Sequence, residues 1–169
     1  MRGGAQLRAL SSCTSHGPRC VRIRKGLSPA MIDVRMCDAA DEKVAALLDD
    51  HRERARNEAS QFRGNYSPNT ESGARNAYVA VVGESAVGSL IVHLRGTDEW
   101  VIDHVHVIRE ARGIGIGDAL MKRILSDASV NGVTRVSSVA LPGDRSTKNL
   151  FERFGLIAEA IVVSKELRT

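Results

Sequence analysis

The feature that most constrains the fold is a run of alternate glycines placed between a strand-like segment and a helix-like segment. Gly113, Gly115 and Gly117 follow residues 100–107, which are rich in the β-branched side chains of a strand. Apolar residues then recur with helical period over residues 117–128. Glycine lets a backbone turn sharply and keeps side chains away from it, so several N–H groups can converge at the positive end of the helix dipole. The sequence therefore predicts a nest for phosphate or pyrophosphate.

Two common phosphate-binding motifs do not account for these glycines. The dinucleotide fingerprint G-x-G-x-x-G needs a third glycine where the sequence has Asp118 or Leu120. The Walker motif needs Gly-Lys followed by Ser or Thr, and no such triplet follows the glycines. A flexible loop without a ligand is the simpler alternative. We expect instead a different pyrophosphate ligand, with the neighbouring Arg112 as a cationic contact.

The rest of the chain predicts a mixed sheet with helices on both faces. Runs of Val, Ile and Leu on either side of residues 83–85 predict a hairpin, which the strand before the glycines extends to an antiparallel meander. Asp41 and Asp144 stand where helix caps are expected, and Gly155 ends the late helix. The expected strands are 32–36, 77–82, 86–94, 100–107, 133–141 and 156–167, and the expected helices run from 41 to about 51 or beyond, within part of 52–76, over 117–128 and over 144–154, with an exposed loop at 64–73.

Charge is unevenly distributed along the chain. The first 32 residues contain six basic residues and no Asp or Glu, which leaves 18 of the 24 Lys and Arg against all 20 Asp and Glu. The sequence pI of 9.2 thus arises from the N-terminal segment, and with few, dispersed aromatic residues it does not indicate a nucleic-acid partner. Residues 1–30 resemble an Arg- and Ser-rich transit peptide, but we favour a disordered extension or a start upstream of Met31. One domain is expected over residues 31–169.

Three cysteines bear on the expected compartment and on metal binding. Cys13, Cys20 and Cys37 are odd in number and form no C-x-x-C pair, so neither a disulfide framework nor a zinc site is indicated. Reduced cysteines fit a cytoplasmic protein. No apolar run approaches the ~20 residues that a membrane helix needs, so no membrane partner is expected.

The segment around the glycines resembles the acetyl-CoA motif of the GNAT superfamily of N-acetyltransferases. Strand residues 105–107, a spacer of four residues and Arg112-x-x-Gly115-x-Gly117 are similar to the family pattern Arg/Gln-x-x-Gly-x-Gly/Ala, whose amides hold the pyrophosphate of CoA. A second match lies downstream. Residues 149–156 (Asn-Leu-Phe-Glu-Arg-Phe-Gly-Leu) resemble the late helix of the family and its ending, commonly Leu-Tyr-Glu-Lys-x-Gly-Phe.

The resemblance covers about residues 31–169, with its most specific part at 100–156, and Val87-Gly88 also resembles a recurrent family feature. It implies an α/β fold with a mixed, mostly antiparallel twisted sheet of six to seven strands flanked by about four helices. It also implies direct transfer of an acetyl group from acetyl-CoA to a primary amine in a ternary complex, without a metal. The residues expected to bind acetyl-CoA are Val105, Val107, Arg112, Gly113, Ile114, Gly115, Ile116, Gly117, Asn149 and Phe151.

The strand before the glycines carries the candidate catalytic groups. The resemblance implies that a backbone N–H near Val107 polarises the acetyl carbonyl, as an oxyanion hole does. An acidic residue of this strand often serves as the base in the family, so Asp103 is the first candidate and His104 the second. A solvated strand carboxylate is the simpler interpretation of Asp103. Because side chains alternate along a strand, Asp103 should share a face with Val105, and His104 with His106.

Two further interpretations concern the histidines. His104 and His106 could be two metal ligands on one face, but no third ligand of suitable spacing stands out, so no metal site is expected. His93 is expected on the surface of its strand rather than among the catalytic groups.

The sequence departs from the family at Phe151, where many relatives carry a tyrosine placed to protonate the leaving thiolate. Phe has no proton to give, which keeps open a non-catalytic acyl-CoA-binding or sensor module as the alternative. A thiol pKa of ~8.5 makes unassisted departure undemanding. The acceptor is expected to be a small-molecule or peptide amine, bound between parts of residues 51–76 and 141–146. A homodimer is expected by family analogy alone.

Overall fold

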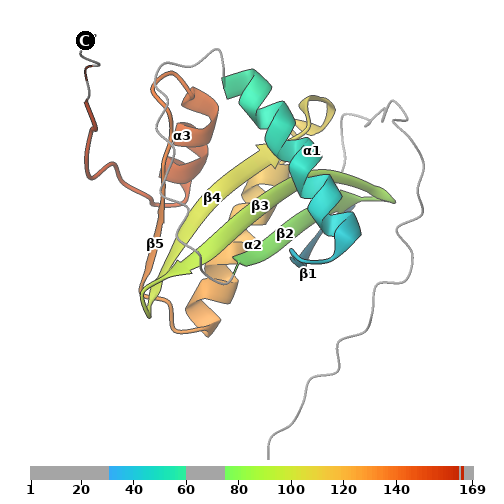
Figure 1. Cartoon of the computed structure of the whole chain (residues 1–169), viewed down its shortest axis with the longest axis horizontal. Coiled ribbons are helices and arrows are strands. Elements are labelled where there is room, and N and C mark those ends of the chain that lie inside the picture. Colours follow the sequence, from blue (N-terminus) through green and yellow to red (C-terminus); the bar gives the residue numbers. More distant parts are fainter. Residues whose placement is uncertain (1–30, 60–74, 164, 166–169) are drawn as a thin grey trace, which may run out of the picture.

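The computed structural model describes residues 31–59, 75–163 and 165. These residues form a five-stranded sheet with three α-helices (Figure 1). Among them, no helix combines the length and the apolar character needed to cross a membrane. In chain order the elements are β1 (Ile32–Asp38), α1 (Glu42–Ala59), β2 (Arg75–Val82), β3 (Ser85–Arg95), β4 (Glu99–Val107), the 3-10 turn η2 (Arg109–Ala111), α2 (Ile116–Val130), β5 (Arg135–Ser138) and α3 (Arg145–Arg153).

The sheet is mixed and mostly antiparallel, as expected. Its strands lie in the order β1-β2-β3-β4-β5, in which the first four pair antiparallel and β5 pairs parallel with β4. The connection from β2 to β3 is a tight turn at Gly83, whose φ of 62° lies in the region that glycine adopts without strain. A parallel pair needs a crossover, and α2 supplies it between β4 and β5. The predicted meander followed by a helical crossover is confirmed.

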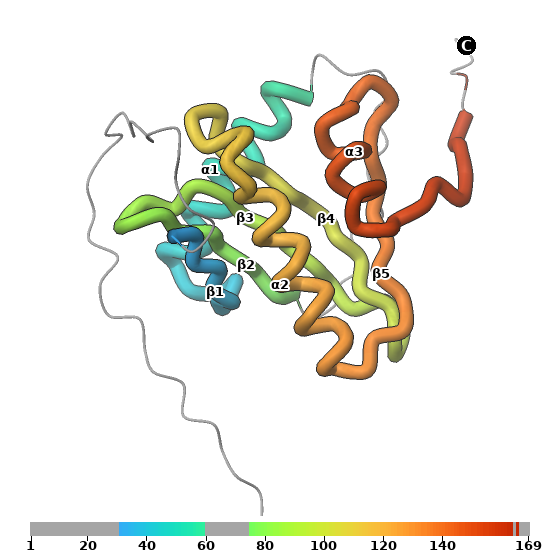
Figure 2. The backbone as a smooth tube through the Cα atoms, turned by 180° about the vertical axis from the view of Figure 1, so that it is seen from behind, coloured from blue at the N-terminus to red at the C-terminus, as the bar shows by residue number. Residues whose placement is uncertain are grey.

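Helices cover both faces of the sheet. α1 crosses one face over β3 and β4, and α2 lies on the opposite face (Figure 1, Figure 2). The main core lies between the sheet and α2 and includes Leu90, Leu120 and Ile124. A smaller cluster, with Leu48 of α1 on Ile91 of β3, lies on the other face. β4 therefore passes between two packed layers, and its side chains face one or the other.

Both predicted helix caps are present. The Asp41 carboxylate accepts two backbone N–H groups in the first turn of α1, at 3.0 Å and 3.2 Å. The Asp144 carboxylate accepts one in the first turn of α3, at 3.0 Å. α1 continues to Ala59, so the polar stretch after residue 51 is in part a continuation of the same helix rather than a separate element. The expected loop at 64–73 lies outside the described residues.

The described residues hold fewer elements than the six to seven strands and about four helices that we expected. The final strand expected at 156–167 is absent over its described part, which is irregular and exposed from 157 to 163. The prediction rested on alternation, but an alternating segment forms a strand only where an edge pairs with it and a face buries it. β5 is four residues long instead of spanning 133–141, so it offers a short edge. Ala158 and Ala160 also have low β propensity.

Candidate active site

The glycine loop connects the end of β4 with the start of α2. Gly113 and Gly115 have φ angles of 80° and 91°, in the left-handed region that favours glycine. The Ala119 N–H donates to the Gly115 carbonyl at 2.9 Å, but within the described residues none of the N–H groups of residues 113–118 donates a hydrogen bond. A Cβ added at either glycine would meet nothing within 4 Å, so open space adjoins these amides. They suit a negatively charged ligand at the positive end of α2.

The outer edge of β4 opens toward the same region. The Ile108 N–H donates to the Val87 carbonyl at 3.0 Å and so points toward β3. Because backbone groups alternate in direction along a strand, the N–H groups of Val105 and Val107 point away from β3. β5 pairs with β4 only as far as Ile102. Beyond that residue, this part of the β4 edge can pair with an extended ligand.

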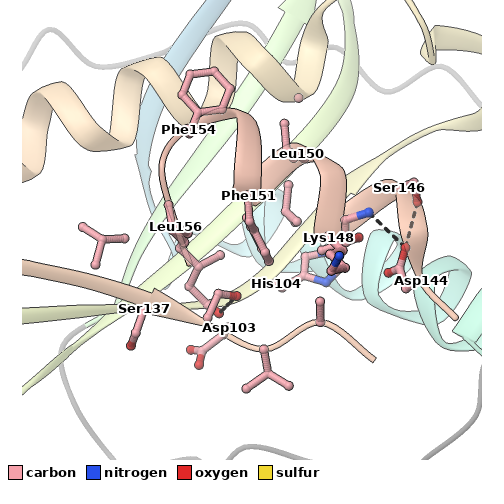
Figure 3. Close-up of a pocket in the computed structure, with 18 of the residues that line it drawn as sticks. Asp103, His104, Ser137, Asp144, Ser146, Lys148, Leu150, Phe151, Phe154 and Leu156 are labelled. Atoms are coloured by element: carbon pink, nitrogen blue, oxygen red, sulfur yellow. Dashed lines mark hydrogen bonds between the residues drawn. The ribbon is translucent and has the colours of Figure 1, made fainter. Parts of the chain in front are cut away.

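A cleft lies where β4 and β5 diverge. Its walls are β4 from 103 to 107, the glycine loop, the segment 136–144 and α3. In Figure 3, Asp103 and His104 approach the cleft from β4 and Phe151 approaches it from α3. The predicted site residues all line this cleft except Ile114, whose side chain packs against the main core. The structure thus brings together residues that are far apart in the sequence.

α3 packs its apolar side against the start of α2. Phe151 is 6% exposed and joins the main core with its neighbour Leu150. Gly117 makes room for this contact, because a Cβ there would lie 3.3 Å from the Leu150 Cδ2 atom. The Arg153 guanidinium also donates to a carboxylate in the first turn of α2 at 2.5 Å. Asn149 is exposed at the cleft, and its hydrogen bond to a ligand stays a prediction.

Arg112 is held on two sides at the mouth of the glycine loop. Its Nε donates to the Val107 carbonyl at 2.9 Å, and its Nη2 donates to the Glu58 carboxylate of α1 at 2.6 Å. The Arg112 side chain is 43% exposed, so this ion pair contributes at most about 1 kcal/mol. A bound anion can therefore compete for the guanidinium. Glu58 was not predicted, because no motif marks its position on the helix.

A β-bulge in β4 interrupts the alternation of side chains at Asp103. Ile102 and His104 pair with consecutive residues of β3, so Asp103 between them is the extra residue. The bulge shifts the phase of the strand: Asp103, His104 and His106 all face α1, whereas Val105 packs into the core on the other side. The prediction that Asp103 shares a face with Val105 is therefore wrong. Bulges often occur beside active sites, where they redirect a side chain.

Asp103 contacts a buried histidine that we expected on the surface. His93 of β3 is 1% exposed, and its Nδ1 lies 2.8 Å from the Asp103 Oδ1 atom, at an angle outside that of a hydrogen bond. The expectation failed because residues 87–93 are covered on both faces of the sheet. The nearly continuous apolar run around His93 was the signal that could have shown its burial.

Three imidazole rings form a neutral array between α1 and β4. The ring centroids of His51 and His106 are 5.3 Å apart, those of His104 and His106 are 6.0 Å apart, and His51 Nδ1 is hydrogen-bonded to Ser89 Oγ at 2.8 Å. Burial lowers the pKa of His51 to about 4 and that of His104 to about 3, and it also lowers the pKa of His106. All three rings are therefore neutral at pH 7. In the part of the chain that the structure describes, no three His, Cys, Asp or Glu side chains are placed to hold a metal ion.

Comparisons with known proteins agree with this fold and site. The sequence profile of the acetyltransferase (GNAT) family matches residues 42–156. Among solved structures, the chain is similar to an aminoglycoside acetyltransferase from an uncultured soil metagenomic sample in complex with sisomicin (17% identity, TM-score 0.64, covering 83% of this chain and 97% of that chain). It is also similar to a ribosomal-protein-alanine N-acetyltransferase from Brucella melitensis biovar Abortus 2308 (20%, 0.57, 80% and 99%). A third is a predicted acetyltransferase with acetyl-CoA from Clostridium acetobutylicum (14%, 0.61, 80% and 96%).

These likenesses define the class of the protein. At such identities the solved structures show the fold alone, which is that of acetyltransferases. A search of curated protein sequences finds no significant match. The family profile covers more than half of the chain, and the chain therefore belongs to the acetyltransferase (GNAT) family. The resemblance that rested on the glycine motif and the late helix is confirmed.

Proposed function

We propose that the protein transfers an acetyl group from acetyl-CoA to a primary amine while both are bound in the cleft. The observation that carries this proposal is the row of N–H groups at residues 113–118 that donate no hydrogen bond within the described chain, beside the open edge of β4. A pyrophosphate suits such a nest at a helix N-terminus. An extended arm that carries amides suits the strand edge, and acetyl-CoA has both parts.

Different residues of the cleft bind different parts of acetyl-CoA. The glycine-loop amides, with Arg112, bind the pyrophosphate, and the β4 edge aligns the pantetheine arm. A backbone N–H near Val107 then polarises the thioester carbonyl. Holding the amine and the thioester in line can lower the barrier by roughly 7–11 kcal/mol. The residues proposed to contact acetyl-CoA are Val105, Val107, Arg112, Gly113, Ile114, Gly115, Ile116, Gly117, Asn149 and Phe151.

Asp103 is our first candidate for the base, and His104 is the second. The Asp103 side chain is 16% exposed, lines the cleft and faces α1, the side from which we propose that the amine approaches. An ammonium must lose a proton before its nitrogen can attack the thioester carbon, and a carboxylate within reach can accept that proton. His104 is neutral and adjacent, but its pKa of about 3 makes it a weak proton acceptor.

Phe151 leaves the last proton transfer to solvent. Its ring cannot protonate the departing thiolate, but a thiolate with a conjugate-acid pKa of ~8.5 can leave without an acid or take a proton from water. We propose that Phe151 packs beside acetyl-CoA, in keeping with its place in the core at the cleft. The same residue favours the alternative function, an acyl-CoA-binding or sensor module without turnover.

We propose a small-molecule or peptide amine as the acceptor. The similar structures include an aminoglycoside acetyltransferase and a ribosomal-protein-alanine N-acetyltransferase, so the fold serves both kinds of amine. α1 contributes acidic and basic side chains to the cleft, which is consistent with a polar acceptor. These side chains are Asp49, Arg52, Glu53, Arg56 and Glu58. A cytoplasmic location and a homodimer remain proposals that rest on the cysteines and on family analogy.

Release of free thiol from acetyl-CoA with a panel of amines tests the proposal. The panel holds aminoglycosides, amino acids, polyamines and peptides that begin with alanine. We expect turnover with one class, and Asp103→Asn should lower kcat ~10²–10⁴-fold while leaving acetyl-CoA affinity unchanged. Binding of acetyl-CoA without thiol release from any amine would favour the sensor module. Failure to bind acetyl-CoA would refute both functions.

A further inference from the structure

His93 and Asp103 meet on the α1 face of the sheet. His93 pairs with Val101 across the β3–β4 ladder, and Asp103, two residues further along β4, points to the same face. The His93 Nδ1 atom lies 2.8 Å from the Asp103 Oδ1 atom. The imidazole is 1% exposed, whereas the carboxylate is 16% exposed and lines the cleft. The pair thus connects the interior under α1 with the candidate active site.

Packing alone does not account for a histidine at position 93. Its strand neighbours Ile91 and Val92 are buried aliphatic residues, and a third aliphatic residue would fill the space. A buried polar atom without a partner costs roughly 1–3 kcal/mol. Among the described residues neither ring nitrogen of His93 has a hydrogen bond of good geometry, and Nδ1 alone lies within hydrogen-bond distance of a carboxylate. The contact of Nδ1 with Asp103 is therefore the feature that an aliphatic residue could not supply.

We infer that His93 is a positioning residue for the acetyl transfer proposed above, on which this inference rests. Its Nδ1–H group donates to Asp103 Oδ1 and keeps the carboxylate turned toward the cleft. When the amine reacts, one N–H bond of the ammonium breaks and an O–H bond forms at Asp103 Oδ2, while the imidazole keeps its own proton. A C–N bond then forms to the acetyl carbon, the C–S bond of the thioester breaks, and the second amine proton passes to solvent or to the departing thiolate. Solvent takes the proton from Asp103 after the amide leaves. Such hydrogen bonds are often poorly aligned without substrate and tighten when it binds, which agrees with the short distance and poor angle here.

Arginine and histidine side chains lie near this pair. Arg75 of β2 lies opposite His93, and Arg52 of α1 contributes to the lowered pKa of His104. Guanidinium groups carry their charge throughout the pH range of enzyme assays. His104 is neutral because burial lowers its pKa to about 3. These neighbouring groups are the same in the wild type and in a His93 variant, so a difference in the pH dependence of their rates tests the contact with Asp103.

Steady-state kinetics of His93→Leu and His93→Asn test the inference. Asn keeps an N–H donor near the position of Nδ1, whereas Leu fills the space without one. We expect His93→Leu to lower kcat ~10–100-fold, to leave the KM for acetyl-CoA unchanged and to move the acidic limb of the pH–rate profile to higher pH. His93→Asn should regain most of the rate. His51→Leu is the matched control, because His51 is equally buried on the same face but bonds to Ser89, and it should keep kcat close to that of the wild type.

Two outcomes separate this inference from the proposed function. A His93→Leu variant with the kcat and pH profile of the wild type, in an enzyme that Asp103→Asn inactivates, would overturn the role of His93 and leave acetyl transfer intact. If no amine turns over, the proposed function fails, and imidazole ¹⁵N NMR of the wild-type protein still tests the contact. We expect a proton on His93 Nδ1. A bare Nδ1, with the proton on Nε2, would contradict the inference.

Discussion

Arg112 connects three parts of the site through one side chain. Its guanidinium bonds to the Val107 carbonyl at the end of β4 and to Glu58 in the last turn of α1, and its backbone begins the glycine loop. The Glu58 ion pair is partly exposed, so it is weaker than a charge-assisted hydrogen bond to a bound pyrophosphate. Arg112 is therefore held at the mouth of the nest but can turn toward an anion.

Arg112→Ala should weaken acetyl-CoA binding ~10–100-fold, because a charge-assisted hydrogen bond contributes roughly 1.5–3 kcal/mol. Calorimetric titration at low and high salt measures the effect, and the difference from the wild type should shrink at high salt because ions screen exposed charges. Arg109→Ala removes an exposed charge outside the cleft and should bind like the wild type. Equal losses in both variants would indicate a general charge effect and contradict the assigned contact.

Residues whose roles follow from a local pattern could be predicted, whereas those that depend on a break in the pattern could not. The caps at Asp41 and Asp144 and the glycine loop are local signals, and the structure contains all of them. The prediction assumed that side chains alternate strictly along β4, and such alternation cannot reveal a bulge. It therefore put Asp103 on the same face as Val105. The prediction that His93 lies on the surface of its strand was wrong because tertiary packing covers both faces of β3.

At the scale of elements, the start of α2 packs directly on β3 at Gly88. A Cβ at Gly88 would lie 2.8 Å from Ile116 Cγ2, 3.1 Å from the His106 carbonyl oxygen and 3.3 Å from Leu120 Cδ1. Strand and helix can approach this closely only because residue 88 has no side chain. The Val87-Gly88 pair in the sequence therefore has a packing role, which is to set the position of the glycine loop relative to β4.

Gly88→Ala should lower the free energy of unfolding by about 1–3 kcal/mol, because the added methyl group overpacks the contact with α2. It should also weaken acetyl-CoA binding, since Ile116 begins α2 directly after Gly115 of the glycine loop. Urea denaturation and calorimetric titration measure the two effects. Gly88→Ala/Ile116→Ala relieves the clash, so its loss of stability should be smaller than the sum of the two single losses. Additive losses of stability in the double variant would show that an alanine side chain at position 88 does not clash with Ile116.

Elements with strong periodicity were predicted well, and the segments at the β5 edge of the sheet were not. β2, β3, β4 and α2 lie within a few residues of their expected positions. β5 is short and the segment 157–163 is irregular, although both looked like strands in the sequence. A local pattern shows which side chains could be buried together, but the partner that buries them is a property of the tertiary fold.

At the scale of the whole molecule, the packing of α1 on the sheet depends on neutral histidines. Burial lowers the pKa of His51 to about 4 and that of His104 to about 3, whereas the unfolded chain has values of about 6.5. Below pH 6.5 the unfolded state therefore binds more protons than the folded state. The contribution of these neutral histidines to the free energy of unfolding is fully present above pH 6.5 and is lost as the pH falls toward 4.

The free energy of unfolding should fall by about 2–4 kcal/mol between pH 7.5 and pH 5. Urea denaturation at several pH values in this window measures it, above the range in which ordinary carboxylates titrate. His51→Gln carries no titrating ring, so it should be less stable at pH 7.5 and lose less on acidification. A wild-type stability that does not change over this window would mean that the rings are not held neutral.

The proposed binding sites for acetyl-CoA and for the amine both adjoin β4. α2 and α3 line the proposed acetyl-CoA side of the cleft, and α1 lines the proposed amine side. α1 and α2 lie on opposite faces of the sheet (Figure 1, Figure 2). The proposed transfer of the acetyl group from acetyl-CoA to the amine requires first that the N–H groups of residues 113–118 bind the pyrophosphate of acetyl-CoA. Every other assignment in the cleft is placed relative to that contact.

Calorimetric titration of acetyl-CoA into the wild type, Gly115→Glu and Gly83→Glu tests this contact directly. Gly115 and Gly83 both have positive φ angles and open space at Cβ, so both substitutions strain the backbone similarly, but only Gly115→Glu adds a carboxylate at the nest. We expect Gly83→Glu to bind acetyl-CoA like the wild type and Gly115→Glu to lose affinity by roughly 100-fold or more, through repulsion and steric exclusion. Wild-type affinity in Gly115→Glu would contradict the assignment of the glycine loop as the acetyl-CoA site.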